Sequence, residues 1–270
     1  MTNKIEDIAT FLLQKIGSKP EIGIILGSGL GALVDKIGVE LEIPYTDIPN
    51  FPVSTVEGHA GKLLFGRIGL KNVMVMQGRF HYYEGYDMDA IVLPVRVMKL
   101  LGIRYLFVSN ASGGLNPAFR TGDLMVITDH INFFPVNPLR GPNNEKFGPR
   151  FPDMGNVYDK GLIQKAFEIA KVESIPLQRG IYIGSSGPTL ETPAEYRMFR
   201  ILGADATGMS TVPEVIVAHH MAIKIFGISI ITNESDTAEE MTTTHEDVQL
   251  HAAYAEPRMT ALFLKLIESL

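Results

Sequence analysis

The feature that most constrains the fold of this chain is an alternation of short apolar runs with longer segments that carry a one-sided apolar face. The short runs, bounded by glycine, proline or polar residues, predict strands at 22–26, 63–68, 73–76, 105–109, 124–127, 180–184 and 225–232. The i, i+3, i+4 spacing predicts helices at 5–16, 89–101, 159–172, 193–202, 212–222 and 245–270, with Gly17, Gly102 and Gly203 as C-terminal caps. This alternation predicts an α/β fold, with helices on both faces of a mostly parallel twisted sheet.

Composition limits the class of partner. The 270 residues are 46% hydrophobic and 20% charged, which suits one large core, and the net charge of −6 argues against nucleic acid. Because the chain has no cysteine, disulfides, thiolate nucleophiles and cysteine-bound zinc are excluded. The polar first residues do not resemble a signal peptide, and no apolar run is long enough for a membrane span. We therefore expect a cytoplasmic protein that binds a small molecule.

A polar segment directly follows the apolar run 73–76. Arg79 can bind an oxyanion through two parallel N–H bonds, His81 can add a third donor, and Tyr82 or Tyr83 offers a flat apolar face with a polar tip. In open α/β sheets, ligands bind beyond the carboxyl ends of such strands. The segment therefore predicts a site for a ligand with both a phosphate and a sugar or base, although a solvated loop anchored by its aromatic rings is the alternative.

Further candidate residues follow other predicted strands or lie in glycine-rich segments. They are Ser28 in 27–32, His59 in 58–61, Ala111 in 109–114, Glu191 in 186–193, Met209 and Ser210 in 208–214, and Asn233 in 230–236, with His245 downstream. Each has an ordinary structural alternative, such as a tight turn, a helix cap or core packing. The glycine segment also matches a dinucleotide-binding motif, with Glu42 as the expected ribose-binding acid. A Rossmann oxidoreductase thus remains open at this point.

The longest irregular stretch, 130–158, is rich in proline and glycine. Loops of this length in compact domains are usually functional or lie at an interface.

Taken together and in order, the motifs resemble the trimeric purine nucleoside phosphorylases. The motifs are Gly27–Gly31, Gly58–Gly61, Gln77–Tyr86, Asn110–Asn116, Gly208–Glu214 and Ile231–Asn233, and the similarity extends over about residues 20–260. The resemblance implies a single α/β domain over 1–270, whose mixed twisted sheet is partly closed into a barrel and flanked by helices on both sides. It also implies phosphorolysis of inosine, guanosine and their 2′-deoxy forms to free base and (deoxy)ribose 1-phosphate in purine salvage. The resemblance implies no metal or organic cofactor. Inorganic phosphate would be a co-substrate.

The resemblance assigns a role to each candidate residue. Phosphate would be bound by Ser28, His59, Arg79, His81, Ala111 and Ser210, and the nucleoside by Tyr83, Phe151, Leu190, Glu191, Met209, Asn233 and His245. His81, Glu191, Asn233 and His245 would form the catalytic set. Because ionised Glu191 only accepts hydrogen bonds and the Asn233 amide can donate, the pair would favour 6-oxopurines.

Phe151 lies in a segment that resembles a loop of this family that reaches into the ribose site of a neighbouring subunit. We therefore expect a homotrimer with shared sites.

Two positions differ from the vertebrate-like pattern of the family. Leu190 stands where an aromatic residue usually packs on the purine, and Glu234 and Asp236 make the loop after Asn233 acidic. A nucleosidase that uses water instead of phosphate, and a nucleoside-binding module without turnover, remain as alternatives to the phosphorylase.

Overall fold

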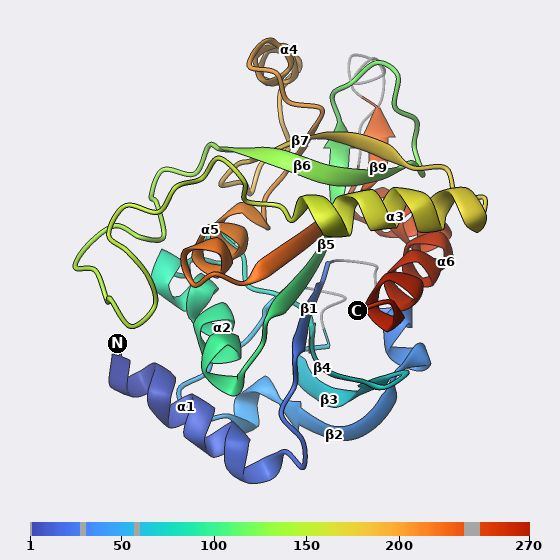
Figure 1. Cartoon of the computed structure of the whole chain (residues 1–270). Helices are drawn as coiled ribbons and strands as arrows, with labels where there is room; N and C mark the ends of the chain where they lie inside the picture. The colour runs from blue at the N-terminus through green and yellow to red at the C-terminus, as the bar shows by residue number, and fades with distance from the viewer. Residues whose placement is uncertain (1, 28–30, 57–59, 235–243) are drawn as a thin grey trace.

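The computed structural model describes residues 2–27, 31–56, 60–234 and 244–270, and a mixed nine-stranded sheet forms its centre (Figure 1). The strands are β1 (Ile22–Leu26), β2 (Gly38–Pro44), β3 (Lys62–Ile68), β4 (Lys71–Gln77), β5 (Tyr105–Gly114), β6 (Leu124–Asn132), β7 (Gln178–Gly184), β8 (Ala206–Gly208) and β9 (Lys224–Glu234). Their order is β2-β3-β4-β1-β5-β8-β7-β6-β9. Because β5 also pairs with β9, the last five strands of this order close into a ring. The predicted mixed sheet, partly closed into a barrel, is confirmed.

The strand directions place the carboxyl ends of several strands together. β1 runs parallel to β4 and β5, and β5 runs parallel to β9, so β4, β5 and β9 end at the same edge. Antiparallel pairings occur between β2 and β3, β3 and β4, β5 and β8, and β6 and β9. The sheet is therefore more mixed than the strand–helix alternation alone predicts.

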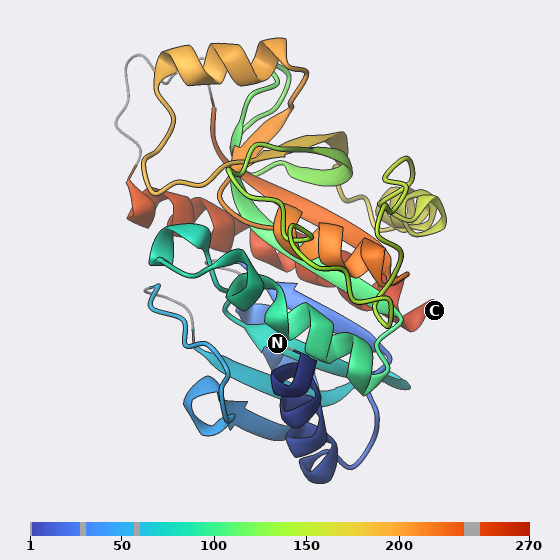
Figure 2. The same cartoon turned by 90° about the vertical axis from the view of Figure 1, so that its left-hand side faces the viewer.

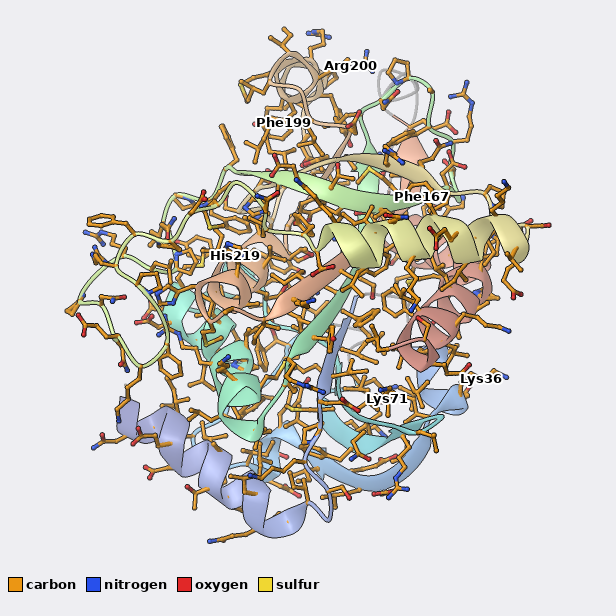
Figure 3. The ribbon with its side chains drawn as sticks, in the orientation of Figure 1. Lys36, Lys71, Phe167, Phe199, Arg200 and His219 are labelled. Carbon is orange, nitrogen blue, oxygen red and sulfur yellow. The ribbon has the colours of Figure 1, made fainter. Side chains whose placement is uncertain are left out.

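Helices cover both faces of the sheet. On one face lie α1 (Thr2–Lys15), α2 (Met88–Leu101) and α5 (Val212–His220), whose apolar residues share one core with the sheet. On the other face lie α3 (Lys160–Val172) and α6 (His245–Glu268), which contribute to a second core (Figures 1 and 2). Side chains fill the space between these layers (Figure 3). None of the described helices is long and apolar enough to cross a membrane.

The remaining helix, α4 (Pro193–Ile201), stands apart from these layers, above β7 in the view of Figure 1. A small cluster of its own fixes it to the sheet: Tyr196 and Phe199 pack with Leu115, Ile183 and Ala204. Phe199 also meets the ring of Phe133 edge to face at 5.3 Å. Arg200, labelled with Phe199 in Figure 3, donates from Nε to Leu115 O at 2.9 Å. Helix α4, which follows Glu191, is therefore held in place by the apolar side chains of Tyr196 and Phe199 and by the basic side chain of Arg200.

Most predicted elements agree with the structure to within a few residues, but β5 and β6 extend five residues beyond their predicted ends, two strands were not predicted, and one predicted cap is wrong. β2 was not predicted because its side chains alternate between exposed and partly buried, and β8 because three residues are too short for any periodicity. Gly102 ends α2 with φ at +105°, and Gly203 follows α4 with φ at +92°. Gly17 lies beyond α1 without a positive φ, so it is not the left-handed cap that its position suggests.

Candidate active site

One cavity collects polar side chains from the edge where β4, β5 and β9 end, together with residues of the antiparallel strand β8. Its volume is about 130 Å³. Many of the residues expected at a site line it, namely Arg79, His81, Tyr83, Ala111, Leu190, Glu191, Met209, Ser210 and Asn233. Topology thus brings together motifs that are far apart in the sequence.

Four of the expected residues are not placed in this cavity. Ser28 and His59 lie outside the described residues. His245 begins α6, but its side chain lies outside the described part of the structure. Phe151 lies elsewhere on the protein, with 88% of its surface exposed.

Arg79 forms the cationic end of the cavity. It is almost fully buried, and its Nε donates to Glu214 Oε1 at 3.1 Å. Its Nη1 donates to the Ser109 carbonyl at 2.7 Å and to Ser210 Oγ at 3.2 Å. Removing one partner of a buried ion pair strands the other charge, so Arg79 and Glu214 form a unit. This unit presents a rigid guanidinium rather than a flexible one.

His81 lies beside this cation and is oriented by Glu84. The Glu84 carboxylate accepts from the His81 backbone N–H at 2.7 Å and lies 3.1 Å from Nδ1, so Nδ1 carries the proton of the neutral ring. Burial lowers the pKa of His81, although the hydrogen bond to Glu84 opposes this shift. Burial raises the pKa of Glu84, but bonds from His81 and Thr55 outweigh it and lower the pKa to about 2. At neutral pH the pair is a neutral imidazole beside a carboxylate.

Tyr83 continues the same wall. Its ring stacks on His81 with 4.7 Å between ring centroids. Burial raises the pKa of Tyr83 to about 12, so its hydroxyl is protonated at neutral pH. The stacked pair offers a flat surface with a polar tip, which suits a sugar ring.

A strained turn positions Ser210. Thr211 has φ +68° and ψ −53°, and Val212 N donates to Ser210 O at 2.7 Å, which defines a γ-turn of the rare positive-φ type. The Asn110 amide donates to Thr211 Oγ1 at 2.9 Å, and Thr211 Oγ1 lies 3.1 Å from Ser210 Oγ. Such strain persists only where surrounding contacts enforce it. Thr211, rather than Ser210, is the residue before α5.

The described residues that follow the glycine segment do not support a dinucleotide site. The residues after it form the short 3₁₀ helix η1 (Ala32–Lys36), and Glu256 Oε1 accepts from Ala32 N at its start at 2.6 Å. A carboxylate from α6 therefore occupies the position that a pyrophosphate would need. Glu42, the expected ribose-binding acid, pairs with Lys62 at 2.7 Å. The Rossmann interpretation is therefore not supported.

Glu191 forms the opposite, acidic end of the cavity. Its Oε1 accepts from Thr207 Oγ1 at 2.7 Å. It does not cap α4, because Thr192 is the cap and Glu195 completes the capping box. Burial raises the pKa of Glu191, and the hydrogen bond from Thr207 offsets part of this shift. A buried acceptor-only group at this position suits a ligand with N–H donors.

A β-bulge presents Asn233 beside Glu191. Along the β5–β9 ladder, Ser112 pairs with Ile231 but Gly113 pairs with Asn233, so Thr232 is the extra residue. Bulges redirect side chains and are common next to active sites. The bulge places Asn233 opposite a glycine, where no side chain competes for space.

Asn110, Tyr196 and Thr207 are among the cavity residues that were not assigned a role from the sequence. Asn110 lies in a motif that the sequence analysis did single out, whereas Thr207 belongs to the short strand β8 and Tyr196 to the apolar pattern of α4. Only the position of Tyr196, close after Glu191, could have drawn attention to it.

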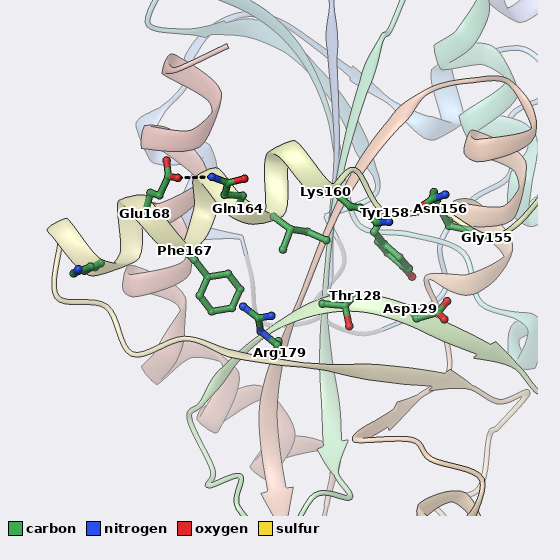
Figure 4. Close-up of a pocket in the computed structure, with 13 residues that line it drawn as sticks. Thr128, Asp129, Gly155, Asn156, Tyr158, Lys160, Gln164, Phe167, Glu168 and Arg179 are labelled. Carbon is green, nitrogen blue, oxygen red and sulfur yellow. Dashed lines mark hydrogen bonds between the residues drawn. The ribbon is translucent and has the colours of Figure 1, made fainter.

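A second cavity lies between α3 and strands β6 and β7, with a volume of about 580 Å³ (Figure 4). Its polar groups largely serve one another: Gln164 donates to Glu168 at 2.8 Å, and the Arg179 guanidinium lies over the Phe167 ring at 4.7 Å. Both acidic and basic side chains line this cavity, and they do not converge on one binding position. Chemistry rather than volume therefore identifies the smaller cavity as the candidate active site.

A metal site is not apparent in the described ranges 2–27, 31–56, 60–234 and 244–270. Within them, no group of three or more histidine or carboxylate side chains is arranged to hold a metal ion.

Comparison with known proteins agrees with this geometry. The profile of the phosphorylase superfamily matches residues 21–268. Purine nucleoside phosphorylase 1 of Bacillus subtilis is 51% identical over 270 residues, covering 100% of this chain and 98% of the relative. The crystal structure of Schistosoma mansoni purine nucleoside phosphorylase in complex with adenosine is 43% identical with a TM-score of 0.94, covering 99% of this chain and 97% of the other. A Schistosoma purine nucleoside phosphorylase in complex with guanosine is 42% identical with a TM-score of 0.91, at the same coverages. The chain therefore belongs to the purine nucleoside phosphorylases of the phosphorylase superfamily.

Proposed function

We propose that this enzyme phosphorolyses inosine, guanosine and their 2′-deoxy forms, giving the free purine and (deoxy)ribose 1-phosphate. The observation that carries the proposal is one cavity with two chemically different ends. Arg79 and Ser210 form an end suited to an oxyanion, and Glu191 and Asn233 form an end suited to a purine edge. A relative crystallised with guanosine supports this assignment.

The chemistry follows from where charge develops. When the glycosidic bond breaks, the ribose becomes cationic and the base gains negative charge, so catalysis requires stabilising both ends more strongly in the transition state. Arg79, His81, the Ala111 N–H and Ser210 would hold phosphate beside the ribose. Asn233 would donate toward the departing base. Positioning converts a bimolecular attack into an oriented one, without a covalent intermediate.

The base edge explains the expected preference. Inosine and guanosine carry an N1–H donor, for which ionised Glu191 is an acceptor, and O6 and N7 acceptors, for which Asn233 supplies a donor. Adenosine lacks the N1–H, although a relative has been crystallised with it. The preference is therefore expected in turnover, where the hydrogen bond that Asn233 donates to the base strengthens as negative charge develops on it.

Several wider assignments belong to the same proposal. We assign residues 1–270 to one catalytic domain, inorganic phosphate as co-substrate with no metal or organic cofactor, and a cytoplasmic location. Ser28 and His59 would complete the phosphate site, and His245 would contact the ribose. A homotrimer would supply Phe151 to a neighbouring ribose site. Neither nucleic acid nor a membrane is a proposed partner, and the net charge of −6 supports the former exclusion.

Inosine turnover with and without phosphate tests the proposal. We expect hypoxanthine release only with phosphate, together with stoichiometric ribose 1-phosphate. Equal release in phosphate-free buffer would establish a nucleosidase instead, and binding without release in either buffer would establish a binding module.

Ser210→Ala tests the phosphate end separately. The variant removes the hydroxyl that accepts from Arg79 at 3.2 Å, so the phosphate KM should rise about tenfold with a smaller change in the inosine KM. The matched control is Ser229→Ala on β9, whose buried hydroxyl has no hydrogen-bond partner among the described residues. Steady-state kinetics at varied phosphate would show whether Ser210→Ala behaves like this control, which would contradict a role in phosphate binding.

A further inference from the structure

Tyr196 lies at the base end of the cavity without an assigned role. It belongs to α4, and 8% of its surface is exposed. Its hydroxyl accepts a hydrogen bond from Asn233 Nδ2 at 3.2 Å. The residue expected to read the purine is therefore already bonded to a tyrosine.

The side-chain oxygen of Asn233 also has a contact within the protein. Thr232 Oγ1 lies 3.2 Å from Ser112 O and 3.4 Å from Asn233 Oδ1, so its single proton is shared between these two acceptors. An amide with one contact at its oxygen and another at its nitrogen has a defined orientation. The second Nδ2 hydrogen remains available for a ligand.

Packing holds the tyrosine and the amide against each other. A side-chain carbon at Gly113 would lie 3.3 Å from the Tyr196 hydroxyl and 3.4 Å from Asn233 Nδ2. The backbone of β5 therefore packs directly under the pair. Glu191 lies close enough for its charge to add to the effect of burial, and together they raise the pKa of Tyr196. Because Asn233 Nδ2 donates to it, the Tyr196 hydroxyl uses an oxygen lone pair in this contact.

The orientation of this amide decides which purine it recognises. With Nδ2 toward the base, Asn233 donates to the O6 or N7 acceptor of a 6-oxopurine. A flipped amide would present Oδ1, which suits the exocyclic amine of adenine. We propose that Tyr196 is a positioning residue for base selection, because its hydroxyl holds the Asn233 amide in the donating orientation. This inference rests on the proposed function and adds to it a determinant of specificity on α4.

Tyr196→Phe tests the inference, because it removes only the hydroxyl. The readout is the ratio of kcat/KM for inosine to that for adenosine, with the competitive Ki of adenosine where its turnover is too slow. This ratio does not depend on the fraction of folded enzyme. We expect it to fall about five- to tenfold, as for loss of one hydrogen bond, with the phosphate KM unchanged.

The matched control is Tyr158→Phe, another buried tyrosine, whose hydroxyl lies 3.3 Å from His130 Nδ1 and which does not line the candidate active site. It should keep the wild-type ratio. In an Asn233→Ala background, Tyr196→Phe should have no further effect on the ratio.

An unchanged ratio in Tyr196→Phe, or an equal decrease in the Asn233→Ala background, would overturn the inference. If the wild-type enzyme phosphorolyses inosine, either of these results leaves the proposed function intact. Only failure of the wild-type enzyme to phosphorolyse inosine would overturn that proposal.

Discussion

Arg79 and Glu191 are both charged and largely buried, but only Arg79 has an oppositely charged partner among the described residues. Arg79 has a carboxylate partner in Glu214, so its positive charge is compensated before any ligand arrives. Glu191 forms no ion pair among the described residues, and only neutral groups donate to it: the hydroxyl of Thr207 at 2.7 Å, the hydroxyl of Ser185 and its own backbone N–H. These hydrogen bonds offset part of the desolvation cost of the carboxylate, but burial remains the largest effect and raises its pKa. The ionisation of Glu191 is therefore sensitive to pH and to the bound ligand.

The pH dependence of inosine turnover should report this carboxylate. Because burial raises the pKa of Glu191 above its ordinary value of 4.5, the residue protonates at a higher pH than an exposed glutamate. Protonation removes the acceptor for N1–H, so kcat/KM for inosine should fall as pH decreases through this raised pKa. Glu191→Gln should lower the activity at neutral pH and remove this acidic limb. Kinetics at constant ionic strength between pH 5 and 8 would check it.

His81 provides the contrast. Its pKa is lowered by burial, so its titration lies on the acidic side of an ordinary histidine and would survive in Glu191→Gln. An acidic limb that is unchanged by Glu191→Gln would therefore assign the limb to His81 or another group, and would contradict the role given to Glu191.

The helices and strands show which features of the fold can be predicted from a sequence pattern. Apolar runs and helical periodicity locate strands such as β1 and helices such as α3, because burial on one or both faces leaves a local signature. The bulge at Thr232 and the γ-turn at Thr211 leave no such signature, because long-range packing enforces them. The polar strand ends predicted where the site lies, whereas its precise geometry depends on these irregular features.

The γ-turn before α5 makes Thr211→Val informative. Valine is also β-branched, so it keeps the steric strain at φ +68° but removes the acceptor of Asn110 Nδ2. Leaving this buried amide without an acceptor should lower the free energy of unfolding by about 1–3 kcal/mol. The phosphate KM should rise as well, since Thr211 Oγ1 lies 3.1 Å from Ser210 Oγ. Denaturant unfolding and phosphate kinetics would measure both effects.

Thr260→Val on α6 is the control for that substitution. The Thr260 hydroxyl is buried without a hydrogen-bond partner among the described residues, so replacing it with a methyl group should be neutral or stabilising. If Thr211→Val were as stable as Thr260→Val, the hydrogen bond from Asn110 would not maintain the turn.

At the scale of the whole molecule, closure of the sheet explains why distant motifs form one site. The pairing of β5 with β9 joins residues more than a hundred positions apart, and no local pattern specifies it. The same closure places β8, with Thr207, between β5 and β7. Only the resemblance to a known family predicted this partial barrel, since alternation of strands and helices equally fits an open sheet.

The loop that carries Phe151 is fixed at its base although the ring is exposed. His220 Nε2 donates to Pro149 O at 2.9 Å, and Arg150 Nη1 donates to Leu139 O at 3.0 Å. The Arg150 guanidinium also lies 5.7 Å from the centroid of the Phe151 ring. A positioned aromatic ring that is 88% exposed gains stability if a second subunit covers it. This geometry favours an interface role over a flexible surface loop.

Phe151→Ala should therefore impair the nucleoside site through assembly. We expect the inosine KM to rise about tenfold through loss of an aromatic contact, with the phosphate KM little changed and thermal stability lowered to a smaller extent. Leu70→Ala is the matched control, because Leu70 is an equally exposed apolar residue in the turn between β3 and β4. Light scattering at assay concentration should show a trimer for the wild-type enzyme. A wild-type monomer with full activity, or a Phe151→Ala enzyme whose inosine KM matches that of Leu70→Ala, would contradict a ribose site shared between subunits.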